Sequence, residues 1–459
     1  MSRPNKVSHK LKDVVRRELA LELDKDHQKA DWGGQLTDEM FAYAAKDTKV
    51  LLPLAETLAS NAKEAGLELA AEIECRALPA MAWMANAGLP FDAEGWRGHL
   101  EELEEEKIRL TKKLERLAPE RLGGKPRNWN SHLQVKEAFE LAGVELPNIQ
   151  EKTLSRIDHP LAKILLKYKK VSTMLSNYGP KLLEFVSEGD RIYADWHQIG
   201  AGTGRMSCSK PALQQLTSEV KRYVRAPDGR VLIKADYSQI ELRIAAKVSG
   251  DERMLEAYQK GEDIHLLTAK SLASVGVGKV DRKLAKAVNF GLLYGQGAKG
   301  FKEFARDSYE TDITLEEASL YKRRFFETYP GLAAWHEQER QRMKHGETET
   351  RTLAGRRRVG VERFTEWVNA PVQGTGADGL KLAMALLWER RAECPGAAPV
   401  ACVHDEILVE CDEDEAKKVE AWLEKAMIDG MDEILNGPNV KGPHVPVEVE
   451  TWIGKTWAG

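Results

Sequence analysis

The stretch Val-Leu-Ile-Lys-Ala-Asp-Tyr-Ser-Gln-Ile-Glu-Leu-Arg, residues 231–243, changes its hydrophobic period half-way along. In its first part, Val231, Ile233 and Ala235 recur at every second position, which predicts a β-strand that ends near Asp236. From Ile240 onward the apolar residues recur at helical spacing, which predicts a helix. Asp236 is therefore expected at the end of a strand, where its carboxylate projects from a rigid sheet edge.

A second carboxylate is expected beside the first. An Asp between a strand and a helix is most often a helix N-cap, so Asp236 alone indicates little. Two apolar runs within residues 400–410 flank the polar turn His404-Asp405-Glu406, a pattern that predicts a β-hairpin with Asp405 at its tip. If the two aspartates meet, they can hold two metal ions that clamp the attacking and leaving oxygens of a phosphoryl transfer.

Three segments in this order resemble the motifs of family A DNA polymerases, the bacterial DNA polymerase I group. They are Asp-Tyr-Ser-Gln-Ile-Glu-Leu-Arg at 236–243, Arg-Lys-Leu-Ala-Lys-Ala-Val-Asn-Phe-Gly-Leu-Leu-Tyr-Gly at 282–295 and Val-His-Asp-Glu at 403–406. Three motifs in the order found in the family are far more specific than any one alone. The resemblance covers roughly residues 195–459 and extends more weakly toward residue 40.

Composition is that of a soluble globular protein, with 42% apolar and 31% charged residues among 459, enough for about three domains. The net charge of −4 does not indicate a nucleic-acid binder, but segments 281–306 and 341–358 each carry six basic against two acidic residues. Five widely spaced cysteines predict neither disulfides nor a zinc site. With no apolar leader or spanning segment, a cytoplasmic protein without a membrane partner is expected.

The resemblance implies an α/β (α+β) fold, the right hand of a polymerase. An antiparallel palm sheet would carry helical fingers and a helical thumb, preceded by a partial ribonuclease-H-like 3′–5′ exonuclease domain. The predicted domains are an exonuclease remnant at 1–83, palm entry and thumb at 84–190, palm at 191–250 and 366–459, and fingers at 251–365.

The N-terminal segment resembles the last motif of the proofreading exonuclease at Tyr43 and Asp47, four residues apart on a predicted helix. In that family the Tyr orients the water and the Asp binds metal. The other metal-binding carboxylates would precede residue 10, where the sequence begins. A single carboxylate does not make a two-metal hydrolase, so we expect Tyr43 and Asp47 to be structural and proofreading to be lacking.

The predicted fingers helix carries the nucleotide contacts. Positions 282, 286, 290 and 294 step by four and drift by only about 40° per step on a helix of about 3.6 residues per turn. One face thus presents Arg282, Lys286, Phe290 and Tyr294. The two cations, together with His265, suit a triphosphate, whereas a purely structural stripe would be aliphatic.

The family also implies contacts with DNA and with the nucleotide sugar. Arg205, in the Gly-rich run 197–207, would check base-pair geometry in the minor groove at the primer terminus. The segment 369–378 reads as a loop that leads into a helix. The remaining implied roles are primer or template contacts for Gln214, Asn369, Gln373 and His404, nucleotide contacts for Gln239, a block to the ribose 2′-hydroxyl for Glu241, and packing near the sugar 3′ position for Phe290.

The resulting hypothesis is a DNA-dependent DNA polymerase that extends a primer with dNTPs. It would act as a monomer on primer-template DNA in replication or repair, with two Mg²⁺ ions that Mn²⁺ can replace. Asp236, Asp405 and the Tyr237 carbonyl would bind metal, with Lys286 and Glu406 also assigned to catalysis. The alternatives are a 3′–5′ exonuclease and a non-catalytic DNA-binding relative; a primer-extension assay with and without Mg²⁺ separates the three.

Overall fold

The computed structural model describes residues 8–23, 25, 27–121, 124–273 and 281–458. The chain forms two compact units. The larger unit comprises residues 1–84, 196–207 and 233–452, and the smaller unit comprises residues 85–195, 208–232 and 453–459.

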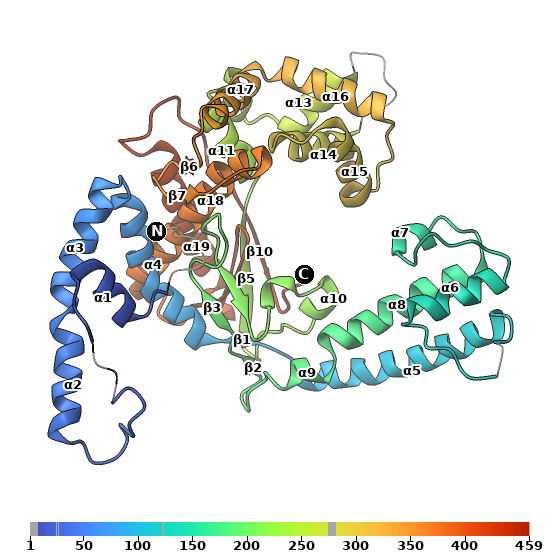
Figure 1. Ribbon diagram of the computed structural model, residues 1–459, viewed down its shortest axis with the longest axis horizontal. Helices are drawn as coiled ribbons and strands as arrows, with labels where there is room; N and C mark the ends of the chain where they lie inside the picture. The colour runs from blue at the N-terminus through green and yellow to red at the C-terminus, as the bar shows by residue number, and fades with distance from the viewer. Residues whose placement is uncertain (1–7, 24, 26, 122–123, 274–280, 459) are drawn as a thin grey trace. The chain divides into compact units, whose positions relative to one another are not determined.

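A four-stranded sheet has the strand order β10-β5-β9-β8, and Asp236 lies near the end of β5. Strands β5 and β10 run side by side in Figure 1. Strand β5 is continuously apolar at Val231, Leu232 and Ile233, which are all buried as expected of an inner strand. Strands β8 and β9 pair antiparallel up to Val403 opposite Glu406, so the predicted hairpin forms with Asp405 in its turn. The strands are β5 (Arg230–Tyr237), β8 (Ala398–Val403), β9 (Glu406–Asp412) and β10 (Val449–Gly454).

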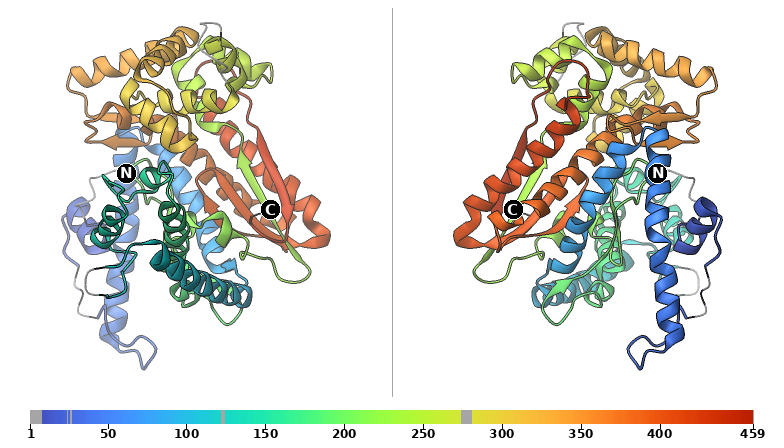
Figure 2. Two further views of the ribbon diagram at one scale, coloured as in Figure 1. Left: turned by 90° about the vertical axis from the view of Figure 1, so that its right-hand side faces the viewer. Right: turned by 90° about the vertical axis from the view of Figure 1, so that its left-hand side faces the viewer.

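Helices make up most of the larger unit, and α18 and α19 pack side by side (Figure 2). Its α-helices are α1 (Leu11–Leu19), α2 (Asp38–Lys49), α3 (Leu51–Glu64), α4 (Glu68–Ala87), α11 (Ile240–Ser249), α12 (Glu252–Gln259), α13 (Ile264–Ala273), α14 (Arg282–Leu293), α15 (Ala298–Tyr309), α16 (Leu315–Thr328), α17 (Pro330–Lys344), α18 (Phe364–Glu389) and α19 (Ala416–Asn436). Short elements complete it: β3 (Asp195–His197), β4 (Ser207–Ser209), β6 (Glu349–Arg351), β7 (Arg357–Val359), η2 (Arg391–Glu393) and η3 (Glu413–Glu415).

The segment 369–378 is helical throughout, so the predicted loop is wrong. Helix α18 begins at Phe364 and contains Pro371 in its interior. Proline and glycine weigh against a helix by about 1 to 3 kcal/mol each, but burial along nearly the whole helix outweighs them. Gly374 is required by packing, since a Cβ there would lie 2.5 Å from the Thr352 side chain and 2.9 Å from the Thr203 carbonyl oxygen.

The smaller unit is built on the long helices α5 and α8, which pack together around an apolar core. Leu103, Leu110 and Leu114 are buried on α5, whereas Leu117, the last helical residue, is 42% exposed. Its elements are β1 (Leu89–Pro90), α5 (Ala93–Leu117), α6 (His132–Leu141), α7 (Glu151–Leu154), α8 (Pro160–Tyr178), α9 (Pro180–Leu183), β2 (Arg191–Ile192), η1 (Leu213–Gln215) and α10 (Ser218–Lys221).

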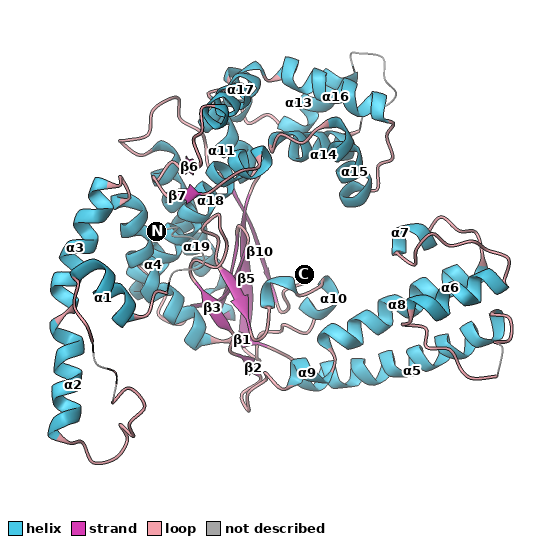
Figure 3. Ribbon diagram, in the orientation of Figure 1, coloured by secondary structure: helices cyan, strands magenta, loops and turns pink. Residues whose placement is uncertain are grey.

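The secondary structure combines many helices with few, partly antiparallel strands (Figure 3), which confirms the predicted mixed α and β class. None of the helices in the described part of the chain is both long and apolar enough to cross a membrane.

Candidate active site

The two predicted aspartates lie next to each other. The Tyr237 backbone N–H donates a hydrogen bond of 3.3 Å to the Asp405 carbonyl oxygen, which joins the end of β5 to the β8–β9 turn. Gln239 and His404 have φ angles of 54° and 57°, so the backbone turns through the left-handed region just after Asp236 and just before Asp405. Such strained residues cluster at functional sites, where the surrounding structure holds them in place.

The local environment disfavours negative charge on both aspartates. Burial, followed by the neighbouring Asp405, raises the pKa of Asp236 to about 7. Burial, followed by the charge of Glu241, also raises the pKa of Asp405. The buried Oδ1 atom of Asp236 has no hydrogen-bond partner within the described ranges.

These features fit a divalent cation. A cation beside the pair would offset the repulsion between the two carboxylates and give the unpartnered Asp236 oxygen a ligand. No group of three or more His, Cys, Asp or Glu side chains around one possible metal position occurs in the part of the chain that the structure describes. One or two carboxylates completed by water and substrate phosphate are the usual ligands of Mg²⁺ rather than of Zn²⁺.

A third carboxylate, Glu241 on α11, is held by two polar side chains. Arg205 Nη2 donates a hydrogen bond of 2.7 Å to one of its oxygens, and the Tyr294 hydroxyl donates to the other. Burial and then the charge of Glu241 raise the pKa of Tyr294, which therefore stays a donor. The three residues come from the 197–207 loop, α11 and the end of α14, so these contacts tie the loop to both helices.

Helix α14 has the predicted face. Arg282 and Lys286 are exposed and Phe290 and Tyr294 are half-buried, whereas most other residues of the helix are buried. Arg282 Nε donates a hydrogen bond of 2.8 Å to Asp263, just before α13. Burial is the largest single influence and would raise the pKa of Asp263. The hydrogen bond and charge of Arg282, together with the backbone N–H groups of Leu266 and His265, outweigh burial, so the pKa is lowered.

His265 differs from the cation that the sequence suggested. Its side chain is only 1% exposed, and its Nδ1 atom lies 2.7 Å from the Asn289 side-chain amide. Burial lowers its pKa to about 4, so the imidazole is neutral at pH 7. The ring packs against Phe290, with 5.8 Å between the ring centroids.

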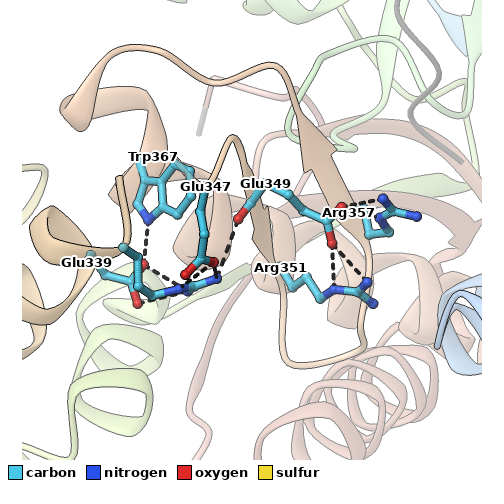
Figure 4. A network of polar contacts seen from close by, with 7 residues as sticks. Glu339, Glu347, Glu349, Arg351, Arg357 and Trp367 are labelled. Atoms are coloured by element: carbon cyan, nitrogen blue, oxygen red, sulfur yellow. Dashed lines mark hydrogen bonds and ion pairs between the residues drawn. The ribbon is translucent and has the colours of Figure 1, made fainter. Parts of the chain in front are cut away.

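Asn369 and Gln373 lie one turn apart on α18, half-exposed on a helix that is otherwise mostly buried. A polar network at the start of this helix fixes its position (Figure 4). The Trp367 indole donates to Glu339 on α17, and Arg342 bonds Glu339 and Glu347 at 3.0 and 2.8 Å. In the adjacent β6–β7 hairpin, Glu349 accepts hydrogen bonds from Arg351 at 2.9 Å and Arg357 at 2.6 Å.

Of the four remaining predicted residues, Tyr237, His404 and Glu406 directly neighbour the aspartates in sequence, whereas Gln214 does not. The Tyr237 side chain is buried and its hydroxyl donates a hydrogen bond of 2.7 Å to the Met427 carbonyl oxygen, which leaves only its backbone for a metal. Glu406 is half-buried at the start of β9, and His404 is exposed in the turn. Gln214 belongs to the smaller unit.

Sequence comparisons identify the family. The sequence model of DNA polymerase family A matches residues 97–459, and a 3′-5′ exonuclease model matches residues 2–63. The chain belongs to DNA polymerase family A. The family and the DNA-directed DNA polymerase activity predicted from the motifs are thereby confirmed. Family A polymerases use divalent metal ions, in keeping with the carboxylate pair of this chain.

Several relatives support the assignment. This family A chain is 34% identical to DNA polymerase I of Aquifex aeolicus over 98% of its length and 81% of that protein. It is 33% identical to the thermostable DNA polymerase I of Thermus aquaticus, of which it spans about half (52%). A similar solved structure is the POL domain of Pol1 from M. smegmatis in complex with DNA primer-template and dNTP. The TM-score is 0.80, with 25% identity over 99% of this chain and 80% of the other.

Lys25, a basic residue that the sequence analysis did not single out, lies beside Tyr43 and Asp47 in the N-terminal segment of this family A chain. The Lys25 ammonium donates hydrogen bonds of 3.0 and 2.9 Å to the two oxygens of Asp47 and one of 3.3 Å to the Tyr43 hydroxyl. The hydrogen bond to Asp47 is the main cause of the raised pKa of Lys25. In a metal-binding exonuclease motif, a metal ion would lie beside the aspartate carboxylate. Here the Lys25 ammonium lies beside Asp47 instead.

The pKa of Asp236 predicts how the stability of the metal-free protein changes with pH. The Asp236 carboxyl loses its proton near pH 3.8 in the unfolded chain but near pH 7 in the folded protein. As the pH rises between these values, Asp236 therefore lowers the free energy of unfolding increasingly. Asp236→Asn should therefore raise the thermal unfolding midpoint at pH 8 but change it little at pH 4, measured by circular dichroism in EDTA.

Two comparisons complete this experiment. Adding Mg²⁺ at pH 8 should reduce the difference in unfolding midpoint between Asp236→Asn and the wild-type protein, because the ion stabilises only the wild-type carboxylate. Asp312→Asn, at an exposed aspartate, should show no such pH dependence. An equal effect of Asp236→Asn at pH 4 and pH 8 would contradict the raised pKa.

Proposed function

We propose that this polymerase adds deoxynucleotides from dNTPs to the 3′ end of a DNA primer, directed by a DNA template, with two bound Mg²⁺ ions for which Mn²⁺ can substitute. The observation that supports this most is the pairing of Asp236 with Asp405, in which negative charge is disfavoured and, among the residues that the structure describes, the Asp236 Oδ1 atom has no hydrogen-bond partner. A primer-extension assay with purified protein, with and without Mg²⁺, tests the proposal.

Asp236, Asp405 and the Tyr237 backbone carbonyl would hold the ions, with Glu406 beside them. When bound, Mg²⁺ ions in such a site stabilise charge on the attacking and leaving oxygens of an in-line displacement. The protein's part is to keep the two carboxylates in place. The hydrogen bond between Tyr237 and Asp405 and the buried β5 strand supply this rigidity.

The exposed face of α14 would bind the triphosphate. Arg282 offers a planar fork for paired oxygens, and Lys286 a compact charge that can also stabilise the leaving group. Phe290, Tyr294 and Gln239 would line the sugar and base, and His265 would contact phosphate as a neutral donor. A bound triphosphate would exchange places with Asp263, which now pairs with Arg282.

The template and primer would be contacted by Arg205, Gln214, Asn369, Gln373 and His404. The polar network beyond the start of α18 supports this for Asn369 and Gln373, because it fixes the helix that carries them. The Pol1 structure with a DNA primer-template and dNTP supports the same class of substrate for this chain.

The proposed domains are an exonuclease-like segment at 1–83, palm entry and thumb at 84–190, palm at 191–250 and 366–459, and fingers at 251–365. We place the polymerase in the cytoplasm as a monomer, acting in replication or repair.

Asp405→Ala should abolish nucleotide addition, a fall in kcat of at least about a thousandfold, because the metal ions lose one of two shared carboxylates. DNA affinity should stay nearly unchanged, since phosphate contacts dominate it. Rapid-quench extension and fluorescence anisotropy measure the two effects. Asp414→Ala, at an exposed carboxylate nearby in sequence, is the control; substantial extension by Asp405→Ala would refute the two-metal assignment.

The chain should not shorten a primer strand. With Lys25 paired to both oxygens of Asp47, a metal ion has no free carboxylate there. Incubation of a 5′-labelled primer-template with Mg²⁺ and without dNTPs should leave the primer intact, and a mismatched 3′ end should be extended untrimmed. Mg²⁺-dependent shortening that Asp47→Ala removes would show instead that this segment is an active exonuclease.

Sugar selection should depend on Glu241 and Phe290. Because Arg205 and Tyr294 hold the Glu241 carboxylate in place, Glu241→Ala should admit ribonucleotides. Phe290→Tyr should raise the use of dideoxynucleotides relative to dNTPs by at least about tenfold, or about 1.4 kcal/mol, by supplying a hydroxyl where the 3′-hydroxyl is missing.

Competitive single-nucleotide incorporation on one primer-template measures both ratios. Tyr294→Phe is the matched control for Glu241, since it removes one of the two contacts but keeps the carboxylate. It should increase ribonucleotide use less than Glu241→Ala does. Unchanged ratios in both Glu241→Ala and Phe290→Tyr would mean that the nucleotide pocket lies elsewhere.

A further inference from the structure

A buried cluster of four charged side chains lies behind the loop that carries Arg205. Glu74 on α4, Arg356 before β7, and Asp378 and Lys381 on α18 are each at most 7% exposed. Arg356 bonds Glu74 at 2.5 Å and Asp378 at 2.7 Å, and Lys381 bonds Glu74 at 2.5 Å. Two acids and two bases therefore balance, as a buried cluster requires.

The cluster holds the 197–207 loop at both of its ends. The Gln198 side-chain amide donates hydrogen bonds of 2.7 Å to the Glu74 carbonyl oxygen and 2.5 Å to its carboxylate. At the other end, Lys381 Nζ donates a hydrogen bond of 2.7 Å to the Gly204 carbonyl oxygen. That carbonyl belongs to the peptide bond that leads directly into Arg205.

Steric contact reinforces these hydrogen bonds. Gly204 has a φ of +89°, and a Cβ at this position would lie 2.6 Å from Cδ of Arg356, so the loop rests directly on the arginine stem. The carbonyl oxygen of Thr203, the residue before Gly204, lies 2.9 Å from where a Cβ of Gly374 would be. The backbone before Arg205 is thus enclosed by the hairpin and α18.

Burying four charges is seldom the most stable choice, because well-packed apolar residues of similar volume are often as stable or more so. Such a cluster instead fixes the positions of the elements that carry it, since each buried charge must keep its partners. Here the geometry being fixed is that of a loop whose Arg205 reaches Glu241 at 2.7 Å.

We propose that Glu74 and Lys381 are positioning residues for Arg205. Through Gln198 and the Gly204 carbonyl, they orient the Arg205 guanidinium toward the primer terminus. Glu74 lies outside both matched family models, in the stretch between residues 63 and 97. The helix that joins the exonuclease-like segment to the polymerase therefore contributes to the checking of the primer end. This inference rests on the proposed role of Arg205 in primer extension.

The test is a double-mutant cycle between Gln198→Met and Arg205→Ala. Gln198→Met removes the contacts between loop and Glu74 but leaves all four charges paired. The readout is the ratio of kcat/KM for extending a matched and a mismatched primer terminus. Arg205→Ala should lower this ratio. Gln198→Met should lower the ratio about fivefold in the otherwise wild-type protein, but less than about twofold in the Arg205→Ala protein. The two effects should not add, because Gln198 acts through Arg205.

Thr352→Val is the matched control. It removes the 2.7 Å hydrogen bond from Thr352 to Asp378 and so weakens the cluster without touching Gln198 or Lys381. It should change the ratio by less than about twofold. Circular dichroism and the unfolding midpoint confirm that each variant is folded, and Glu74→Gln provides a second variant that keeps the side-chain shape.

Three results would overturn the inference. They are an equal effect of Gln198→Met with and without Arg205, an effect of Thr352→Val as large as that of Gln198→Met, and an unchanged ratio in Arg205→Ala. Failure of the wild-type protein to extend even a matched primer would instead refute the proposed function.

Discussion

The close approach of two carboxylates at the end of β5 is the constraint on which the rest of the site depends. A backbone hydrogen bond from Tyr237, at the end of β5, to Asp405, in the β8–β9 turn, holds Asp236 and Asp405 close together. Their own charges would not do so, because like charges in a partly buried place repel. The sheet must therefore be rigid enough to hold an arrangement that the side chains oppose. The buried apolar run of Val231, Leu232 and Ile233 in β5 provides this rigidity.

A chain of polar contacts extends outward from this pair. Glu241 contributes to the raised pKa of Asp405 and is itself held by Arg205 and Tyr294, so the loop, α11 and α14 meet at one carboxylate. The loop is held in turn by the buried charges of Glu74 and Lys381. A shift of the loop, α11 or α14 would therefore displace the aspartates through only a few side-chain contacts.

The sequence predicted those parts of the site that local pattern controls. The change of period after Asp236, the hairpin at Asp405 and the spacing of Arg282 and Lys286 all appear in the structure as expected. The helix through 369–378 was missed, because its proline and glycines argue locally for a loop and only burial against neighbouring elements makes it helical. The charge state of His265 was missed for a similar reason, since burial is a property of the fold.

The charge cluster behind the loop could not have been found by spacing at all. Glu74 pairs with residues 282 and 307 positions away, and nothing in the stretch around Glu74 distinguishes it from a surface glutamate. Long-range ion pairs of this kind leave no periodic signal in one sequence.

The ion pair between Arg282 and Asp263 has a consequence for turnover. If Arg282 binds the triphosphate as proposed, the incoming phosphate would replace the Asp263 carboxylate as the partner of the guanidinium. It would then gain less than it would from a guanidinium without an acidic partner. The same exchange would run in reverse when pyrophosphate leaves, since Asp263 could pair with Arg282 again. Such a competing carboxylate would lower the affinity for substrate and product alike and so favour fast release over tight binding.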